Sequence, residues 1–187
     1  MLTISERITV ASWRRFAIWL IALIAFSAWA FGMDSPWTRA LELAGGKLPE
    51  MQPGIPAIEP VRSLQALGAN TSDYLLWQVL DIPYALMNVM LAWTGLGLGI
   101  KALHLQSSVL RFLMCLPPVY FVCELVENTL VALFASGALP PSEGFVLVQQ
   151  FATTTKFTTS APAMILALAG AAVAGVIAIL NKVRKSS

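Results

Sequence analysis

The chain has 187 residues, of which 57% are hydrophobic and only 12% are charged, and its mean hydropathy is +0.72. A soluble domain carries about 25% charged residues, so this composition excludes an ordinary water-soluble globular protein. The formal net charge of +2 does not by itself decide about nucleic acid. Because the basic residues flank apolar runs, we expect no nucleic-acid partner.

The first apolar run extends from Phe16 to Met33, follows Arg7, Arg14 and Arg15, and predicts a helix over about residues 14–33. Ala28-Trp29-Ala30 imitates the cleavage site of a secretory signal. However, a run of about 18 residues can span a bilayer. We therefore expect an uncleaved first transmembrane helix.

Residues 34–72 form a polar segment rich in proline and glycine, which predicts a connection outside the membrane core. Short helices over 37–44 and 59–68 are expected within it. In the second, Val61, Leu64 and Leu67 share one face, a spacing that suits a helix lying on a membrane surface.

Three further helices are predicted over residues 73–100, 109–136 and 143–181. Pro117 and Pro118 each remove a backbone donor and predict a kink in the third helix. The fourth run exceeds a simple span, and Pro162 is expected to divide it. The predicted fold is all-α, a single domain built as an integral membrane four-helix bundle.

The placement of basic residues predicts the orientation of the bundle, because cytoplasmic loops carry an excess of lysine and arginine. Segments 1–15, 101–111 and 181–187 are basic, whereas 34–72 mixes basic and acidic residues. The chain is therefore expected in a bacterial inner membrane, with both termini cytoplasmic and 34–72 outside. The basic residues of the cytoplasmic segments are Arg7, Arg14, Arg15, Lys101, Arg111, Lys182, Arg184 and Lys185.

Small residues predict where the helices approach one another closely. Gly95 and Gly99 form a Gly-x-x-x-Gly pair on the second helix, and Gly170 with Ala174 forms a similar pair on the fourth. Such faces let backbones meet in lipid. We expect a contact within the chain in preference to a dimer interface.

Polar side chains recur at helical spacing on three of the predicted helices, so each helix presents one polar stripe. Ionisable groups are costly at membrane depth, and they usually face a bundle interior or a cavity. Counted along the helices, Asp81, Glu124 and Glu127 reach the outer leaflet, whereas Lys156 lies beyond it. A bend at Pro162 and the long lysine stem would bring the Lys156 ammonium down to the three carboxyls. The candidate ligand- or proton-binding residues are Asp81, Tyr84, Asn88, Tyr120, Glu124, Glu127, Asn128, Thr155 and Lys156.

Three carboxylates against one lysine would leave a charge of −2 in a site that excludes water. One hypothesis is that a carboxyl is protonated at neutral pH or that a cation binds there. The alternative is that Lys156 pairs with Asp81 or Glu127, in a network that fixes the helix register without further chemistry.

The stretch from Leu64 to about Leu168 resembles a family of uncharacterised four-helix membrane proteins found in many bacteria. The resemblance rests on Leu80-Asp81-Ile82-Pro83-Tyr84, on Leu116-Pro117-Pro118 followed by Glu127-Asn128, and on Thr155-Lys156. It implies a four-helix membrane fold, and it supports the choice of four of the candidate residues, Asp81, Glu127, Asn128 and Lys156. It implies no particular activity or cofactor.

Three classes of function fit these observations. The first is a binding or accessory protein whose polar outer-leaflet pocket holds a lipid, an amphiphile or the helix of a partner. A homo-oligomer or another membrane partner is compatible with this class. The second is a proton-coupled small transporter or permease subunit, because acids and proline-interrupted helices occur in transport pathways. The third is an intramembrane lipid-modifying enzyme with Glu124 or Glu127 as base, although the sequence predicts no catalytic set, no metal site and no identifiable cofactor.

Overall fold

The computed structural model describes residues 11–43, 46, 48, 64, 67, 71–105 and 108–186. These residues form helices and no strand, which confirms the predicted all-α class. The helices are α2 (Trp13–Ala30), α3 (Pro36–Leu43), α5 (Thr71–Ala102), α6 (Ser108–Ala135) and α7 (Glu143–Ser186). By length and composition, α2, α5, α6 and α7 could each cross a membrane.

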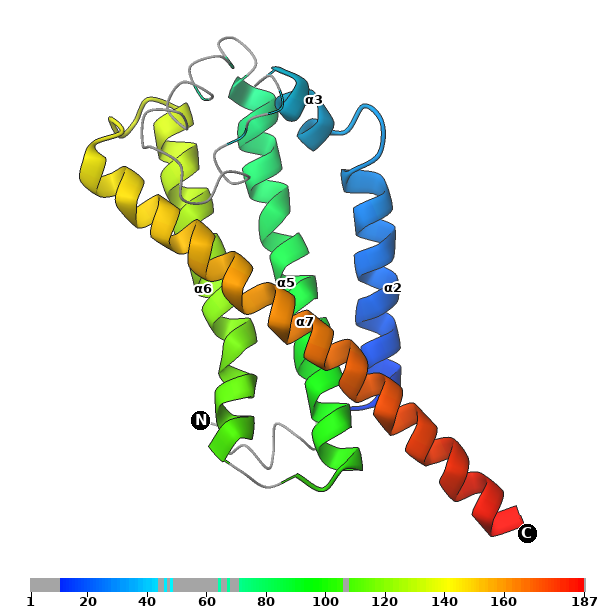
Figure 1. The fold of residues 1–187 in the computed structure, drawn as a ribbon. Helices are drawn as coiled ribbons and strands as arrows, with labels where there is room; N and C mark the ends of the chain where they lie inside the picture. The colour runs from blue at the N-terminus through cyan, green and yellow to red at the C-terminus, as the bar shows by residue number, and fades with distance from the viewer. Residues whose placement is uncertain are drawn as a thin grey trace.

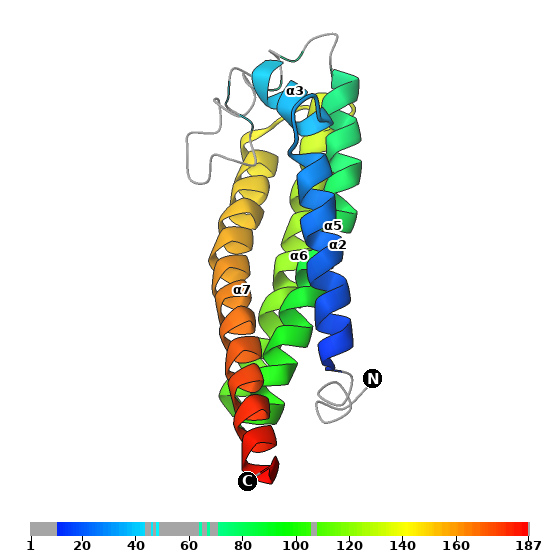
Figure 2. The same cartoon turned by 90° about the vertical axis from the view of Figure 1, so that its right-hand side faces the viewer.

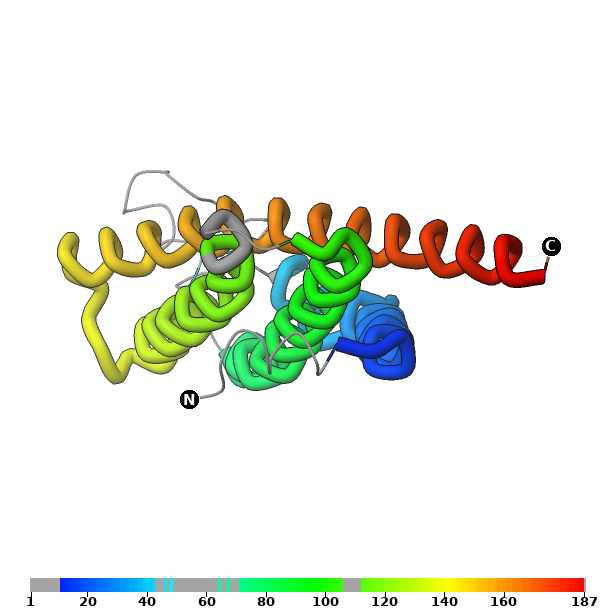
Figure 3. Tube along the Cα trace, turned by 90° about the horizontal axis from the view of Figure 1, so that it is seen from below, coloured from blue at the N-terminus to red at the C-terminus, as the bar shows by residue number. Residues whose placement is uncertain are grey.

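Three of the four long helices form a layer, and the fourth, α7, crosses it. α6, α5 and α2 lie side by side in that order, and α7 runs diagonally over one face of this layer (Figures 1 and 3). α5 is the central element, because it packs against α2, α3, α6 and α7. The start of α2 and the C-terminal end of α7 lie at the end of the bundle opposite to α3 (Figure 2).

Glycines allow α5 and α7 to cross in close contact. A Cβ atom at Gly95 would lie 2.6 Å from the Ala167 carbonyl oxygen, and one at Gly99 would lie 2.6 Å from the Cα atom of Gly170. Gly95 and Gly99 therefore meet another helix of the same chain, as their spacing predicts. Any larger side chain there would push α7 away from α5.

The prolines do not interrupt the helices, and the prediction that Pro162 divides the last helix is wrong. α7 continues through Pro162, and α6 continues through Pro117 and Pro118. Pro118 cannot donate to the Met114 carbonyl oxygen, but the Trp93 indole nitrogen donates to that oxygen at 3.0 Å. A neighbouring helix thus replaces a hydrogen bond that proline removes, which is how such helices stay intact.

The described residues of the 34–72 segment pack at one end of the bundle. Its predicted first helix is present as α3, whereas most of the predicted 59–68 helix lies outside the described residues. Leu64 and Leu67 are described and are buried in a cluster with Ala40, Tyr74 and Val131. These two leucines pack against the bundle and do not lie on a membrane surface.

The first helix also ends earlier than predicted, at Ala30 instead of residue 33. The chain turns over the next residues, where Asp34 adopts a left-handed conformation with φ of 64°. Hydropathy could not predict this turn, because residues 31 and 33 are apolar. The turn places Phe31 and Trp37 close to α5, where their rings reach the Trp77 ring.

Candidate functional site

Three helices turn their polar stripes toward one another in the half of the bundle nearer to α3. These polar side chains are buried between the helices, and the opposite faces of the same helices expose large apolar residues. This is the usual arrangement of polar groups in membrane-spanning helices. α5 contributes Gln78 and Asp81; α6 contributes Glu124, Glu127 and Asn128; α7 contributes Gln149, Thr153 and Lys156. Each set recurs at three- or four-residue spacing, so each occupies one helix face.

Lys156 is the centre of an ion cluster between α6 and α7. Its ammonium donates to Glu124 Oε1 at 3.1 Å and also to Glu127 Oε2. The Thr153 hydroxyl donates to the other oxygen of Glu127, and the Gln149 amide donates to Thr153 Oγ1 at 2.8 Å. Both oxygens of the fully buried Glu127 carboxylate therefore have donors.

Asp81 joins this cluster from α5 but has fewer partners. The Asn128 amide nitrogen donates to Asp81 Oδ2 at 3.2 Å, and the Asp81 carboxyl lies beside that of Glu124. Within the described part of the chain, no basic side chain forms an ion pair with Asp81. With one ammonium and three carboxyl groups, the cluster keeps a formal charge of −2 when all four are ionised.

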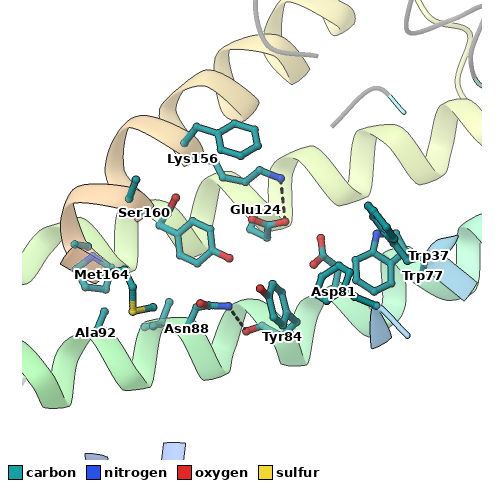
Figure 4. A pocket seen from close by; sticks show the side chains of 17 residues that line it. Trp37, Trp77, Asp81, Tyr84, Asn88, Ala92, Glu124, Lys156, Ser160 and Met164 are labelled. Carbon is teal, nitrogen blue, oxygen red and sulfur yellow. Dashed lines mark hydrogen bonds and ion pairs between the residues drawn. The ribbon is translucent and has the colours of Figure 1, made fainter. Parts of the chain in front are cut away.

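A cavity of about 430 Å³ lies beside this cluster, between α5, α6, α7 and α3. Asp81, Glu124 and Lys156 form its charged wall, as Figure 4 shows. Along α5 the wall continues through Tyr84 and Asn88, whose side-chain amide donates to the Tyr84 carbonyl oxygen at 2.9 Å. The volume is within the range of small-molecule pockets.

Four aromatic rings close the end of the cavity nearest to α3. The centroid of the Phe31 ring lies 5.2 Å from that of Trp37, 5.3 Å from that of Trp77 and 5.4 Å from that of Tyr84. Trp77 and Tyr84 flank Asp81 on the same face of α5, Trp77 about one helical turn before it and Tyr84 about one turn after it. The carboxyl of Asp81 thus lies among aromatic rings at this end (Figure 4).

The structure brings together most of the residues that the sequence singles out. Asp81, Tyr84, Asn88, Tyr120, Glu124 and Lys156 line the cavity. Glu127 and Asn128 do not line it. Glu127 accepts a hydrogen bond from Lys156, and Asn128 donates one to Asp81.

Thr155 has a different place from the one predicted. It is half-buried and does not line the cavity, because a residue next to Lys156 is rotated by about 100° around the helix. Thr153 shares the face of Lys156 instead and binds the cluster.

Sequence reasoning left Phe31, Trp37 and Trp77 out of the candidate site. The position of Trp77, one turn before Asp81 on the same helix face, was a usable signal. The positions of Phe31 and Trp37 depend on the turn after α2, which carries no clear pattern in the sequence.

No protein-family model, curated protein or solved structure matches the chain. The resemblance to bacterial four-helix membrane proteins therefore stays a prediction. Among the described residues, no group of three or more histidine, cysteine or acidic side chains is arranged to hold a metal ion. The chemistry that the described site offers is charge, hydrogen bonding and aromatic contact.

Proposed function

We propose that the chain is a small multi-pass protein of the bacterial inner membrane that binds a lipid or another amphiphile in the cavity beside Asp81. Both termini would be cytoplasmic, and the cavity would lie in the outer leaflet. The membrane, its type and the orientation are part of this proposal, as is membership of the bacterial family that the sequence resembles.

The outer surface of the helices supports the membrane setting. Large apolar side chains are exposed along all four long helices, among them Ile21 at 67%, Val79 at 63%, Phe112 at 66% and Ile165 at 67%. Soluble proteins rarely expose contiguous apolar faces of this extent. In a lipid bilayer these apolar side chains would contact lipid tails and would not be exposed to water.

The positions of the helix ends agree with the proposed orientation. Lys101 at the end of α5 and Arg184 and Lys185 in the last turn of α7 lie at one end, opposite to α3 (Figure 2). Under the positive-inside rule this end faces the cytoplasm. The cavity, which Trp37 of α3 helps to close, then lies toward the outer surface.

The single observation that carries the binding role is the two-sided chemistry of the cavity. One wall carries buried charges, and the other consists of aromatic and aliphatic side chains such as Phe157, Ala161 and Met164. Binding pockets combine such apolar walls with a few placed polar groups. No specific observation favours proton-coupled transport or lipid modification, so binding is the function proposed.

Filling the cavity tests this proposal. Ser160 lines the cavity from α7, whereas Thr158 on the same helix is exposed and does not. The two variants Ser160→Trp and Thr158→Trp exchange small polar side chains for the same large one. Native mass spectrometry of gently solubilised protein should show a lipid or amphiphile on wild type and Thr158→Trp, and none on Ser160→Trp.

The melting temperatures of both variants provide the control for folding. If Ser160→Trp folds and retains the adduct of the wild type, the adduct does not occupy this cavity. If wild-type protein carries no adduct and acquires none from an added membrane lipid extract, the proposed function is wrong.

A further inference from the structure

The charged wall of the cavity is formally negative when its carboxyls are ionised, because Asp81 and Glu124 outnumber Lys156. The ammonium of Lys156 is already bound by Glu124 and Glu127, so little of its charge is left for an anionic ligand. Asp81 is 93% buried, lines the cavity, accepts a hydrogen bond from the Asn128 amide and lies beside the Glu124 carboxyl. An unbalanced carboxylate in such a place attracts a cation.

The aromatic rings around Asp81 indicate which kind of cation fits. Metal ions such as Mg²⁺ and Ca²⁺ need several oxygen ligands, and the rings of Phe31, Trp37 and Trp77 supply none. Aromatic faces attract organic ammonium ions, and cages of such rings recognise quaternary ammonium groups. Four rings beside one buried carboxylate therefore favour an organic ammonium group over a metal ion.

The opposite part of the cavity suits an apolar chain. Phe157 and Ala161 on α7 line the cavity and are also exposed on the outside of the bundle, Phe157 at 47%. Met164 continues this wall one turn further along α7. A chain leaving the cavity past these residues would enter the lipid around α7 without crossing polar protein.

We propose that the cavity binds a cationic amphiphile, with its ammonium group against Asp81 among the aromatic rings and its apolar chain along Phe157 and Met164. This inference rests on the proposed binding function and adds the chemical class of the ligand. The ammonium could belong to a lipid head group, where a phosphate precedes it, or to a free amphiphilic amine.

A set of probes that share an octyl chain and differ in the charge of the head group tests the charge preference. Octyltrimethylammonium, octylphosphocholine, octyl glucoside and octyl sulfate are titrated into the protein in maltoside micelles, and binding is followed by calorimetry. We expect saturable binding of the two ammonium probes and at least tenfold weaker binding of the other two. Tighter binding of octylphosphocholine than of octyltrimethylammonium identifies a lipid head group, and the reverse order identifies a free amine.

Matched variants test the site. Asp81→Asn removes the charge and keeps the shape, and it should weaken ammonium binding by roughly 30-fold, the lower end for losing one partner of a buried charge pair. Asp73→Asn is the control, because Asp73 lies on the same helix, partly exposed beside Arg39 at 3.9 Å. Trp77→Leu should also weaken ammonium binding, whereas Trp29→Leu, at a residue 56% exposed on α2, should not.

The outcomes separate this inference from the proposed function. If octyl glucoside or octyl sulfate binds as tightly as octyltrimethylammonium, and Ser160→Trp still abolishes binding, the cavity binds amphiphiles but the cationic preference is wrong. Equal ammonium affinity of Asp81→Asn and wild type also overturns the inference. If no probe binds saturably to the folded protein, both the inference and the proposed function are wrong.

Discussion

Removing the ammonium of Lys156 should destabilise the bundle more than any other single change in the cluster. Methionine keeps much of the unbranched stem of lysine but carries no charge. At 3.1 Å from Glu124, the ammonium gains about 5 kcal/mol of Coulomb energy at an effective dielectric constant of about 20. The desolvation of both groups offsets part of this gain, and losing one partner of a buried pair costs about 3–5 kcal/mol.

The corresponding fall in melting temperature is about 10 °C, since 1 kcal/mol shifts a chain of this length by about 2–4 °C. The assay is thermal unfolding of Lys156→Met in maltoside micelles, followed by tryptophan fluorescence. Lys182→Met is the matched control, because Lys182 lies exposed near the end of the same helix.

A compensating variant distinguishes charge from packing. Lys156→Met combined with Glu127→Gln removes one charge of each sign and should recover part of the lost stability. A fall of less than about 2 °C for the single variant, or no recovery in the double variant, would refute the reasoning. The cluster would then be solvated in the folded protein.

Three other predictions concern packing, hydrogen bonding and topology. Gly95→Ala should lower the melting temperature, because its new Cβ would lie 2.6 Å from a carbonyl oxygen of α7, whereas Gly144→Ala, with open space around it, should not. Thr153→Val should lower the free energy of unfolding by about 1–3 kcal/mol, since it removes a donor to a buried carboxylate. Thr154→Val, at an exposed neighbouring position, should change the free energy of unfolding little in the same measurement. In a cysteine-free background, Met33→Cys, at a residue 96% exposed, should react with a membrane-impermeant maleimide added outside spheroplasts; reaction only after lysis would reverse the proposed orientation.

The long helices could be predicted because apolar length is a property of the sequence. The predicted starts at residues 14, 73, 109 and 143 lie within two residues of the observed ones. The error at Pro162 has a physical cause. One proline removes one hydrogen bond, and the surrounding turns of a 44-residue helix keep theirs.

The polar stripes could also be predicted, but the partners of each charge could not. Helical spacing shows which residues share a face, and it does not give the rotation or the relative height of two helices. Lys156 had two proposed partners, Asp81 and Glu127, and the structure places it on Glu127 and Glu124. That choice depends on the close approach of α7 to α5 and on its diagonal course over α6, and both are properties of the assembled bundle.

The structure suggests that the network hypothesis and the binding hypothesis describe different parts of one cluster. Glu127 is fully buried, has donors on both oxygens and does not line the cavity, as expected for a residue that fixes α6 against α7. Asp81 lines the cavity, pairs with no basic side chain among the described residues and lies beside aromatic rings. Substitution of Glu127 should therefore act mainly on stability, and substitution of Asp81 mainly on ligand affinity. A cation bound at Asp81 would also relieve its repulsion from Glu124, so ligand binding and bundle stability should rise together.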